Sequence, residues 1–534
     1  MRILKIRWWI PVSLALLLAG AFVAIDYYYA KQAFEQEQRT GLGVAASPSV
    51  AWDPRSTWSQ RSPRLFAPPA QVPGIIGGVG HGASAGISPS TEEYSAIQEN
   101  GFVDAAKERL STVSIDVDTA SYTNVRRFLR QGQRPPANAV RIEELLNYFT
   151  YSYPDPTGPE PFSITTEIAP CPWTPAHRLL RVGLKSKTIE TRDLPPSHLT
   201  FLIDVSGSMD HPAKLPLVKR SFALLVEQLR PQDMLAIAVY ADAEGLILPP
   251  TPGSQKGVIL DAIDRLEAGG STAGGSGIQL AYKTARTMYR PDANNRVILA
   301  TDGDFNVGVS SDDELIKLVE TERNHGVFLT VLGYGMGNLK DGKLEKLADH
   351  GNGHYAYIDS ILEARRVFVE QLGATLQTVA KDVKFQLDFN PARIRSYRLV
   401  GYENRKLTAE EFLDDRKDAG DLGAGHTVTA LYELVPNGTE PLPEDSFTLR
   451  LRYKPPQSNQ SVELAVTGSA ETARPSSDLR FAAAVAQFGM LLKNSQDKGG
   501  STFETAIALA QSAISGDSRR TEFLELLGKA SEMN

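Results

Sequence analysis

Residues 201–210 read FLIDVSGSMD, and this stretch decides how the middle of the chain is expected to fold. An apolar run ends in Asp204-Val205-Ser206-Gly207-Ser208, which places a carboxylate and two hydroxyls on alternate positions. Residues two apart on an extended chain lean to the same side, so these three side chains can face one point. The apolar run is typical of a buried strand, and the polar residues stand where that strand ends.

Two later segments carry side chains of the same chemical kind. Thr272 lies in GGSTAGGSG at 269–277, and Asp302 lies in RVILATDGD, again where an apolar run ends. Asp204–Ser208 taken alone could be a turn that closes a strand, because Ser, Gly and Asp are common turn residues. The combination with Thr272 and Asp302 favours a binding site instead.

This order of strand, D-x-S-x-S, loop threonine and second strand with T-D-G resembles the von Willebrand factor type A (VWA) domain and its metal-ion-dependent adhesion site. The resemblance implies that Ser206 and Ser208 bind a divalent metal directly and that Thr272 binds it directly or through water. Asp204 and Asp302 are implied to hold waters and hydroxyls around the ion. We expect Mg2+, with Mn2+ or Ca2+ as alternatives, because hard cations take oxygen ligands. The family's usual sixth ligand is a Glu or Asp of a protein partner.

Between residues 198 and 381, apolar runs alternate with amphipathic segments. The expected strands are Leu199–Asp204, Met234–Tyr240, Arg296–Thr301, Val327–Tyr334 and His354–Ile358. The expected helices are Lys214–Leu229, Gln255–Leu266, Ser276–Tyr289, Asp312–Asn324, Lys343–His350 and Ile361–Val379. This alternation predicts an α/β fold with a doubly wound, mostly parallel sheet. Ligands of such sheets bind beyond the carboxyl ends of the strands, where Asp204 and Asp302 are placed.

Both flanks of this domain show the period-two pattern of half-buried strands. Residues 382–470 predict four strands, and residues 91–197 predict a few more, such as Phe162–Ala169 and Arg178–Lys187. Each set is too small for a separate core, so we expect one β-sandwich built from both flanks, with the VWA domain inserted. The segment 471–534 predicts a helical tail that packs on the sandwich, with a capping box at Ser501–Glu504. This organisation resembles a bacterial, membrane-associated subgroup of VWA proteins whose extension and C-terminal domain are uncharacterised.

Residues 1–30 are expected to form a membrane anchor or a signal peptide. Basic residues precede an apolar run, Trp8–Ile25, which can just cross a bilayer with its basic end in the cytoplasm. A signal peptide cleaved near Ala19–Ala21 is the alternative, which would release the chain into the periplasm. We favour the uncleaved anchor because aromatic residues stand at both ends of the run. Residues 31–90 are rich in Pro, Gly and Ser and predict a disordered linker that places the remainder outside the cytoplasm.

A second motif needs its own interpretation. Asp116-Val117-Asp118-Thr119 matches D-x-D-x-T, the motif of haloacid-dehalogenase-type phosphohydrolases. In those enzymes the first Asp attacks phosphorus and the second acts as general acid. The strand before this motif, Ser111–Ile115, is short and half polar, and a helix follows at once. Capping of that helix near Asp118 or Thr119, with carboxylates at the surface, is therefore the preferred interpretation.

Composition excludes several classes of function. A net charge of −7 over 534 residues does not favour nucleic acid, and the single cysteine, Cys171, excludes a disulfide framework. The sequence of the loop 269–277 is similar to that of a nucleotide-binding P-loop, but Ser276 stands where the lysine is required, so we expect no bound nucleotide.

Neither a nucleophile–base pair nor a zinc-ligand pattern is present, so we do not expect an enzyme. The leading hypothesis is a membrane-tethered module outside the cytoplasm that uses a divalent metal to bind an acidic side chain of a protein partner. A phosphohydrolase acting through Asp116 and Asp118 is one alternative. A passive envelope scaffold whose metal only stabilises the fold is the other.

Overall fold

The computed structural model describes residues 92–533, apart from 116–117, 243, 271–274, 304–311, 338, 372–376 and 515. The expected anchor at Trp8–Ile25, the linker, Asp116 and Thr272 lie outside the described residues. Among the helices that are described, none combines the length and the apolar character needed to cross a bilayer.

The central domain is built on one six-stranded sheet. Its order is β10 (Tyr355–Ile358), β9 (Phe328–Tyr334), β8 (Asn294–Thr301), β5 (Ser197–Asp204), β6 (Met234–Tyr240) and β7 (Glu244–Pro252). All neighbouring strands are parallel except β6 and β7, which confirms the predicted mostly parallel sheet. Strand β7 was not predicted, because Pro249, Pro250 and Pro252 interrupt its pattern. Its place at the edge of the sheet explains why these prolines are tolerated.

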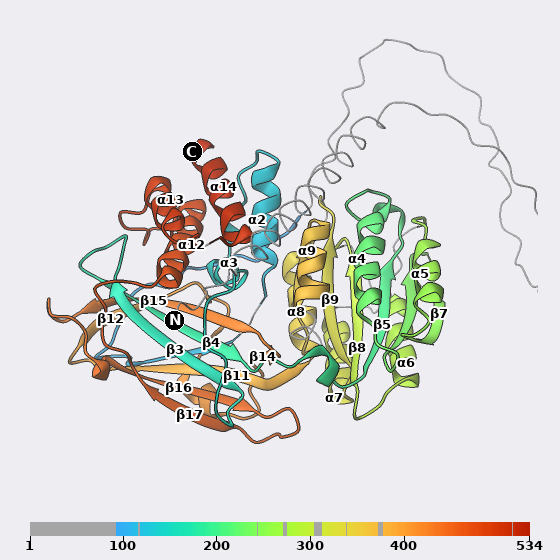
Figure 1. Cartoon of the computed structure of the whole chain (residues 1–534), viewed down its shortest axis with the longest axis horizontal. Helices are drawn as coiled ribbons and strands as arrows, with labels where there is room; N and C mark the ends of the chain where they lie inside the picture. The colour runs from blue at the N-terminus through green and yellow to red at the C-terminus, as the bar shows by residue number, and fades with distance from the viewer. Residues whose placement is uncertain are drawn as a thin grey trace, which may run out of the picture. The chain divides into compact units, whose positions relative to one another are not determined.

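Helices cover both faces of this sheet (Figure 1). Helices α4 (Leu215–Gln228), α5 (Lys256–Asp264) and α9 (Ile361–Arg365) pack on one face, and α6 (Gly275–Thr287), α7 (Asp312–Asn324) and α8 (Asp341–His350) pack on the other. Alternation along β5 explains this division, since Phe201 and Ile203 belong to the first core and Leu202 to the second.

The last helix of the domain is shorter than predicted. After α9 the chain forms a π-helical turn at Arg366–Glu370, and the next described element, β11 (Thr378–Phe389), is a strand. The expected helix Ile361–Val379 is therefore wrong at its end. Thr378 and Val379 are β-branched residues that suit a strand, and Thr378 pairs with Gly423 of β14 (Gly420–Gly423).

The flanks form a β-sandwich of two antiparallel sheets. One sheet has the order β1 (Val103–Asp104), β12 (Ile394–Val400), β15 (Thr427–Pro436), β4 (Arg178–Ser186) and β3 (Phe162–Pro170). The other has the order β13 (Lys406–Leu407), β2 (Leu110–Ser114), β11, β16 (Phe447–Lys454) and β17 (Val462–Thr467), with β14 also paired to β11. The pairs β4–β15 and β2–β11 join strands from before and after the central domain. The predicted sandwich built from both flanks is confirmed.

A helical layer covers the outer face of the β15 sheet (Figure 1). It consists of α2 (Ala120–Arg130), α3 (Ile142–Asn147), α12 (Ser477–Lys493), α13 (Phe503–Gln511) and α14 (Ser518–Glu532). Leu431 of β15 packs into this layer, whereas its neighbour Tyr432 packs into the sandwich core. The predicted capping box is displaced by one residue, because α13 begins at Phe503: Thr502 and Thr505 exchange the two capping hydrogen bonds.

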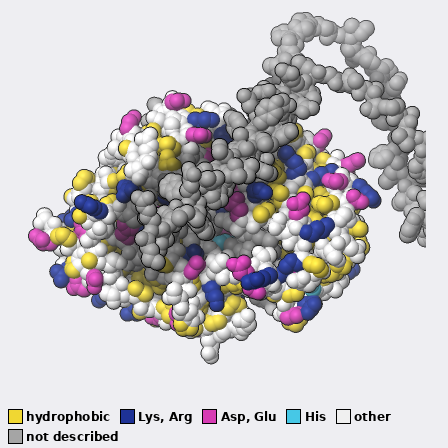
Figure 2. All heavy atoms as spheres, in the orientation of Figure 1, with side chains coloured by type: hydrophobic (Ala, Val, Ile, Leu, Met, Phe, Trp, Pro, Cys, Tyr) yellow, Lys and Arg dark blue, Asp and Glu magenta, His cyan; other side chains and the backbone are white. Residues whose placement is uncertain are grey.

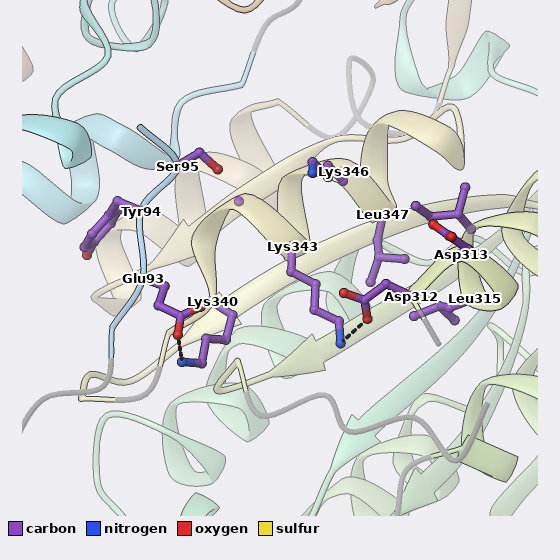
Figure 3. A pocket seen from close by; sticks show the side chains of 12 residues that line it. Glu93, Tyr94, Ser95, Asp312, Asp313, Leu315, Lys340, Lys343, Lys346 and Leu347 are labelled. Carbon is purple, nitrogen blue, oxygen red and sulfur yellow. Dashed lines mark ion pairs between the residues drawn. The ribbon is translucent and has the colours of Figure 1, made fainter. Parts of the chain in front are cut away.

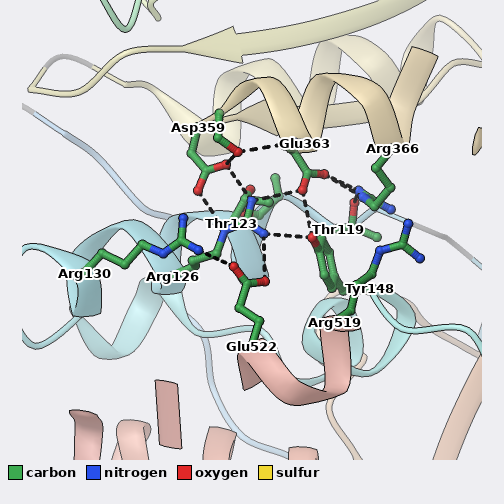
Figure 4. Close-up of polar contacts among 12 residues, drawn as sticks. Thr119, Thr123, Arg126, Arg130, Tyr148, Asp359, Glu363, Arg366, Arg519 and Glu522 are labelled. Carbon is green, nitrogen blue, oxygen red and sulfur yellow. Dashed lines mark hydrogen bonds and ion pairs between the residues drawn. The ribbon is translucent and has the colours of Figure 1, made fainter. Parts of the chain in front are cut away.

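A buried ion-pair network joins the central domain to the helical layer (Figure 4). Arg126 of α2 contacts Asp359 at 2.5 Å and Glu363 of α9 at 3.0 Å. The same guanidinium reaches Glu522 of α14 at 3.2 Å and donates to the Tyr148 hydroxyl at 2.8 Å. Three separate parts of the chain are thus held by one side chain that is only 3 % exposed.

Asp118 belongs to the same interface and is not a surface carboxylate. Its Oδ1 accepts a hydrogen bond from the backbone N–H of Tyr355 at 3.0 Å, and its Oδ2 accepts one from Arg405 at 3.4 Å. The N-cap of α2 is Thr119, whose side chain makes no capping bond and accepts from Arg366 instead. The predicted surface cap is therefore wrong, since Asp118 links the extension to the start of β10.

Candidate metal centre

The predicted site lies at the carboxyl edge of the central sheet. Asp204 is the last residue of β5, and Asp302 directly follows β8. Strands β5 and β8 are parallel neighbours, so both carboxylates stand at the same edge. Both side chains are fully buried.

Hydroxyl groups connect these carboxylates. A 3-10 turn at Gly207–Met209 follows β5 and brings the Ser206 and Ser208 Oγ atoms to 3.1 Å from each other. Ser208 Oγ donates to Asp302 Oδ2 at 2.7 Å, and the Ser206 backbone N–H donates to Asp204 Oδ1 at 2.9 Å. The structure therefore brings Asp204, Ser206, Ser208 and Asp302 together around one point.

The start of the glycine-rich loop is tied to the same turn. The backbone N–H of Gly207 donates to the Gly270 carbonyl at 2.9 Å. Gly270 has φ +78°, and a Cβ there would lie 2.5 Å from Asp242 Oδ2, so this position requires glycine. Thr272 itself lies outside the described residues, but the chain enters its segment beside the serine turn.

Hydroxyl groups from the two neighbouring strands, β6 and β8, hold the Asp204 carboxylate in place. Its Oδ2 accepts hydrogen bonds from the Tyr240 hydroxyl at 3.0 Å and from Thr301 Oγ1 at 3.3 Å. Burial raises the pKa of Asp204 to about 6; the hydrogen bonds from Ser206 oppose this rise, and the nearby charge of Asp302 adds to it. The described partners of Asp204, which are the Ser206 backbone, the Tyr240 hydroxyl and the Thr301 hydroxyl, are all neutral.

Lys214 is a member of the site that the sequence did not reveal. It precedes α4, and its Nζ lies 2.8 Å from Asp302 Oδ2, the oxygen that also accepts from Ser208. Its side chain is 10 % exposed. No spacing in the sequence connects Lys214 with Asp302, because the two meet only when β8 lies beside β5.

The donor set fits a hard divalent cation. Two carboxylates and two hydroxyls converge, and all of them offer oxygen atoms as ligands. No group of three or more His, Cys, Asp or Glu side chains suited to a metal occurs among the described residues. A metal at Asp204 and Asp302 would therefore be held with the help of neutral hydroxyls.

A cavity of about 520 Å3 opens between the segment 93–95 and helices α7 and α8 (Figure 3). Both helices follow strands of the parallel sheet, so they begin at the edge that carries the metal-site residues. Its charged groups largely pair with one another: Lys340 with Glu93 at 2.9 Å and Lys343 with Asp312 at 2.8 Å. Its lining contains no Ser–His or Cys–His pair that would indicate nucleophilic catalysis.

Comparison with known families agrees with this geometry. The model described as "von Willebrand factor type A domain" matches residues 198–370, and the model described as "von Willebrand factor" matches 88–181. The model described as "Uncharacterized protein YfbK, C-terminal" matches 374–533. The fold and the residues at the sheet edge thus define a VWA-domain protein.

The first of three similar proteins shows the family membership. Uncharacterized protein YfbK of Escherichia coli (strain K12) is 40 % identical over 466 residues, which cover 82 % of this chain and 81 % of that protein. Uncharacterized protein sll0103 of Synechocystis is 24 % identical over 54 % of this chain and 68 % of its own length. A solved structure, von Willebrand factor type A from Catenulispora acidiphila, covers 71 % of this chain and 91 % of its own with 18 % identity and a TM-score of 0.40. The chain belongs to the YfbK family of VWA-domain proteins.

Proposed function

We propose that this protein is a membrane-tethered binding module, outside the cytoplasm, which grips an acidic group of a protein partner through a divalent metal. The observation that carries the proposal is the convergence of the Ser206 and Ser208 hydroxyls with Asp302 at the sheet edge. Ser206, Ser208 and Thr272 would hold the metal, and Asp204 and Asp302 would fix its surroundings. A role in protein interaction is the general property of VWA domains that the family membership supports.

The ligand types explain why a partner carboxylate is the proposed target. The bound metal supplies a concentrated positive charge at the sheet edge. Serine and threonine hydroxyls are neutral, so they leave most of that charge uncompensated. A carboxylate that enters a partly closed interface is attracted more strongly there than in bulk water, because the local dielectric is lower.

The visible face of the described residues is compatible with a protein partner. On the face shown in Figure 2, basic and acidic side chains are interspersed rather than gathered by sign. The expected anchor at Trp8–Ile25 and the linker at 31–90 would let the folded part reach a partner at some distance from the membrane.

The phosphohydrolase alternative receives less support from the structure. Asp118, its proposed general acid, is buried and engaged by Tyr355 and Arg405. A general acid must reach the leaving group of its substrate, and these structural bonds occupy the oxygens that would do so. The passive scaffold remains the second candidate and is an outcome of the following test.

The test uses the full-length protein in detergent. Calorimetry should show Mg2+ binding that disappears in Asp302→Ala, because this change removes the carboxylate that accepts from Ser208. Cross-linking in intact cells should capture a partner in Mg2+ and lose it in chelator, and a single Glu→Gln or Asp→Asn change in that partner should abolish capture. Mg2+ binding together with capture that is indifferent to chelator would leave only the scaffold. Absence of Mg2+ binding would overturn the metal site.

A further inference from the structure

Lys214 is built into the metal centre by the fold. Its aliphatic stem runs across Gly335, directly after β9, where a Cβ would lie 2.4 Å from the Lys214 Cγ and Cε atoms. Gly335 also has φ +74°, so any other residue would be strained there. The side chain of Lys214 therefore packs directly on the backbone of Gly335, and its ammonium lies 2.8 Å from Asp302 Oδ2.

The loop at 335–337 is held in place by contacts that include the N-terminal extension. The Gly335 carbonyl accepts a hydrogen bond from the Tyr357 hydroxyl. Two residues later, the backbone N–H of Gly337 donates to Glu92 Oε1 at 2.8 Å, and Glu92 pairs with Arg127 of α2 at 2.8 Å. The position of Lys214 is therefore fixed from outside the VWA domain as well as from within it.

Three charged side chains can be counted among the described residues discussed at this site. Asp204 and Asp302 together carry a formal charge of −2 and Lys214 carries +1, so these three groups sum to −1 without metal. A divalent metal changes the net charge to +1, and one entering carboxylate returns it to zero. Without Lys214 the metal alone would neutralise the two aspartates.

We infer that Lys214 is a resident cation of this site, which compensates Asp302 in the metal-free protein and weakens the binding of the divalent metal. The inference rests on the proposed metal site. Its physical basis is that the ammonium and the metal compete for the same negative charge and repel each other, since Asp302 Oδ2 faces both Lys214 and the ligand Ser208.

Two matched variants of the full-length protein test the inference by calorimetric titration with Mg2+. Lys214→Met keeps most of the stem and removes the charge, so Mg2+ should bind at least about tenfold more tightly. Lys219→Met is the control, because Lys219 lies on α4, the helix that Lys214 precedes, and its ammonium donates to the Asp264 carbonyl, away from the site. Its Mg2+ affinity should equal that of the wild type.

Thermal unfolding gives a second readout. Metal-free Lys214→Met should melt below the wild type, because Asp302 loses its buried counter-ion, and Mg2+ should raise its Tm by more than it raises that of the wild type. Lys214→Arg keeps the charge and guards against a Met variant that fails to fold; its Mg2+ affinity should not exceed that of the wild type.

The outcomes separate the inference from the proposal beneath it. Wild-type protein that binds no Mg2+ overturns the proposed metal site. Wild-type binding with equal or weaker affinity in Lys214→Met overturns the role of Lys214 alone. Tighter binding in Lys214→Arg than in the wild type overturns it too.

Discussion

Two of the buried clusters of charge in the described part of the chain differ in what satisfies their carboxylates. Around Arg126, the carboxylates of Asp359 and Glu363 are met by guanidinium groups at 2.5–3.0 Å, and Arg366 also pairs with Glu363. At the sheet edge, the partners of Asp204 among the described residues are neutral donors, and Asp302 shares one oxygen between a lysine and a serine.

The difference separates a structural cluster from the proposed binding site. The guanidinium of Arg126 compensates the surrounding carboxylates within the fold. A bound ligand would therefore not improve the charge balance of this cluster. At the sheet edge, Asp204, Asp302 and Lys214 sum to a formal charge of −1. The hydroxyl of Ser208, which donates to Asp302, would be able to turn to a metal while Asp302 keeps Lys214 as its partner. Charge balance and donor type, rather than burial, distinguish the two clusters.

Breaking the Arg126 cluster should produce the largest loss of stability. Arg126→Met leaves Asp359 and Glu363 without their shared counter-ion, and we expect the free energy of unfolding to fall by about 3–5 kcal/mol. Urea denaturation measures this change, and Mg2+ affinity should remain unchanged. Arg130→Met, which affects a half-exposed pair with Glu522, should cost less than about 1 kcal/mol. A large loss of Mg2+ affinity in Arg126→Met would show that the two clusters are not independent.

Removing the serine hydroxyls should lower Mg2+ affinity and change stability little, which is the reverse of the result expected for Arg126→Met. Ser206→Ala combined with Ser208→Ala deletes two proposed ligands, so Mg2+ affinity should fall at least about 100-fold, or about 2.7 kcal/mol. The melting temperature without metal should change little, because no buried charge loses a cationic partner. Ser254→Ala, at an exposed serine, is the matched control. Undiminished calorimetric Mg2+ binding in the double variant would remove the proposed site.

Glu143 of α3 offers a third kind of buried carboxylate, one with poor compensation and no proposed ligand. Burial raises its pKa to about 7, and the charges of Glu403 and Glu144 add to the rise. The folded state therefore binds this proton more tightly than the unfolded state does, so the contribution to stability is complete at acid pH and is lost as pH rises towards and through 7.

Glu143→Gln should remove that dependence. Above pH 7 the variant should be more stable than the wild type by on the order of 1–3 kcal/mol, and the two should converge near pH 4. Urea denaturation across this pH range measures the difference, with the exposed Glu410→Gln as control. Parallel curves for Glu143→Gln and the wild type would contradict the assignment.

The smallest effect is expected at Thr272. Thr272→Ala should weaken Mg2+ binding by about tenfold, less than the serine pair, because a water can take the place of this ligand. Calorimetry on the full-length protein measures the change, and the Tm without metal should stay at the wild-type value. A loss as large as that of the double serine variant would make Thr272 a principal ligand.

The sequence predicted the parallel sheet and the four described site residues because both follow from local patterns. Each strand of the central domain is a continuous apolar run, and D-x-S-x-S stands at the end of one. Strand β7 was not predicted because its prolines break the apolar run. The helix from Ile361 was predicted to be too long because its apolar residues continue into β11. Local pattern cannot show where one element gives way to another of similar composition.

Contacts between segments that are distant in the chain could not be predicted from the sequence. Asp118 was predicted at the surface because its neighbours predict a helix start, yet its partners Tyr355 and Arg405 are supplied by the central domain and the sandwich. Lys214 looked like an ordinary lysine at the start of a helix. Its role depends on Asp302 and on the absent side chain of Gly335, and neither is near it in the sequence.

The inserted position of the VWA domain also sets an order of events in time. Strands β2 and β4 must wait for β11 and β15, which are synthesised only after the whole central domain, whereas β5, β6 and β8 find each other within it. Pairing across a long unfolded segment is slow, and it becomes easier once that segment has become compact. We expect pulsed hydrogen exchange during refolding to protect the amides of β5 and β8 before those of β11 and β15. The domain proposed to bind the partner would then be the first part of the chain to mature, and the sandwich that carries it the last.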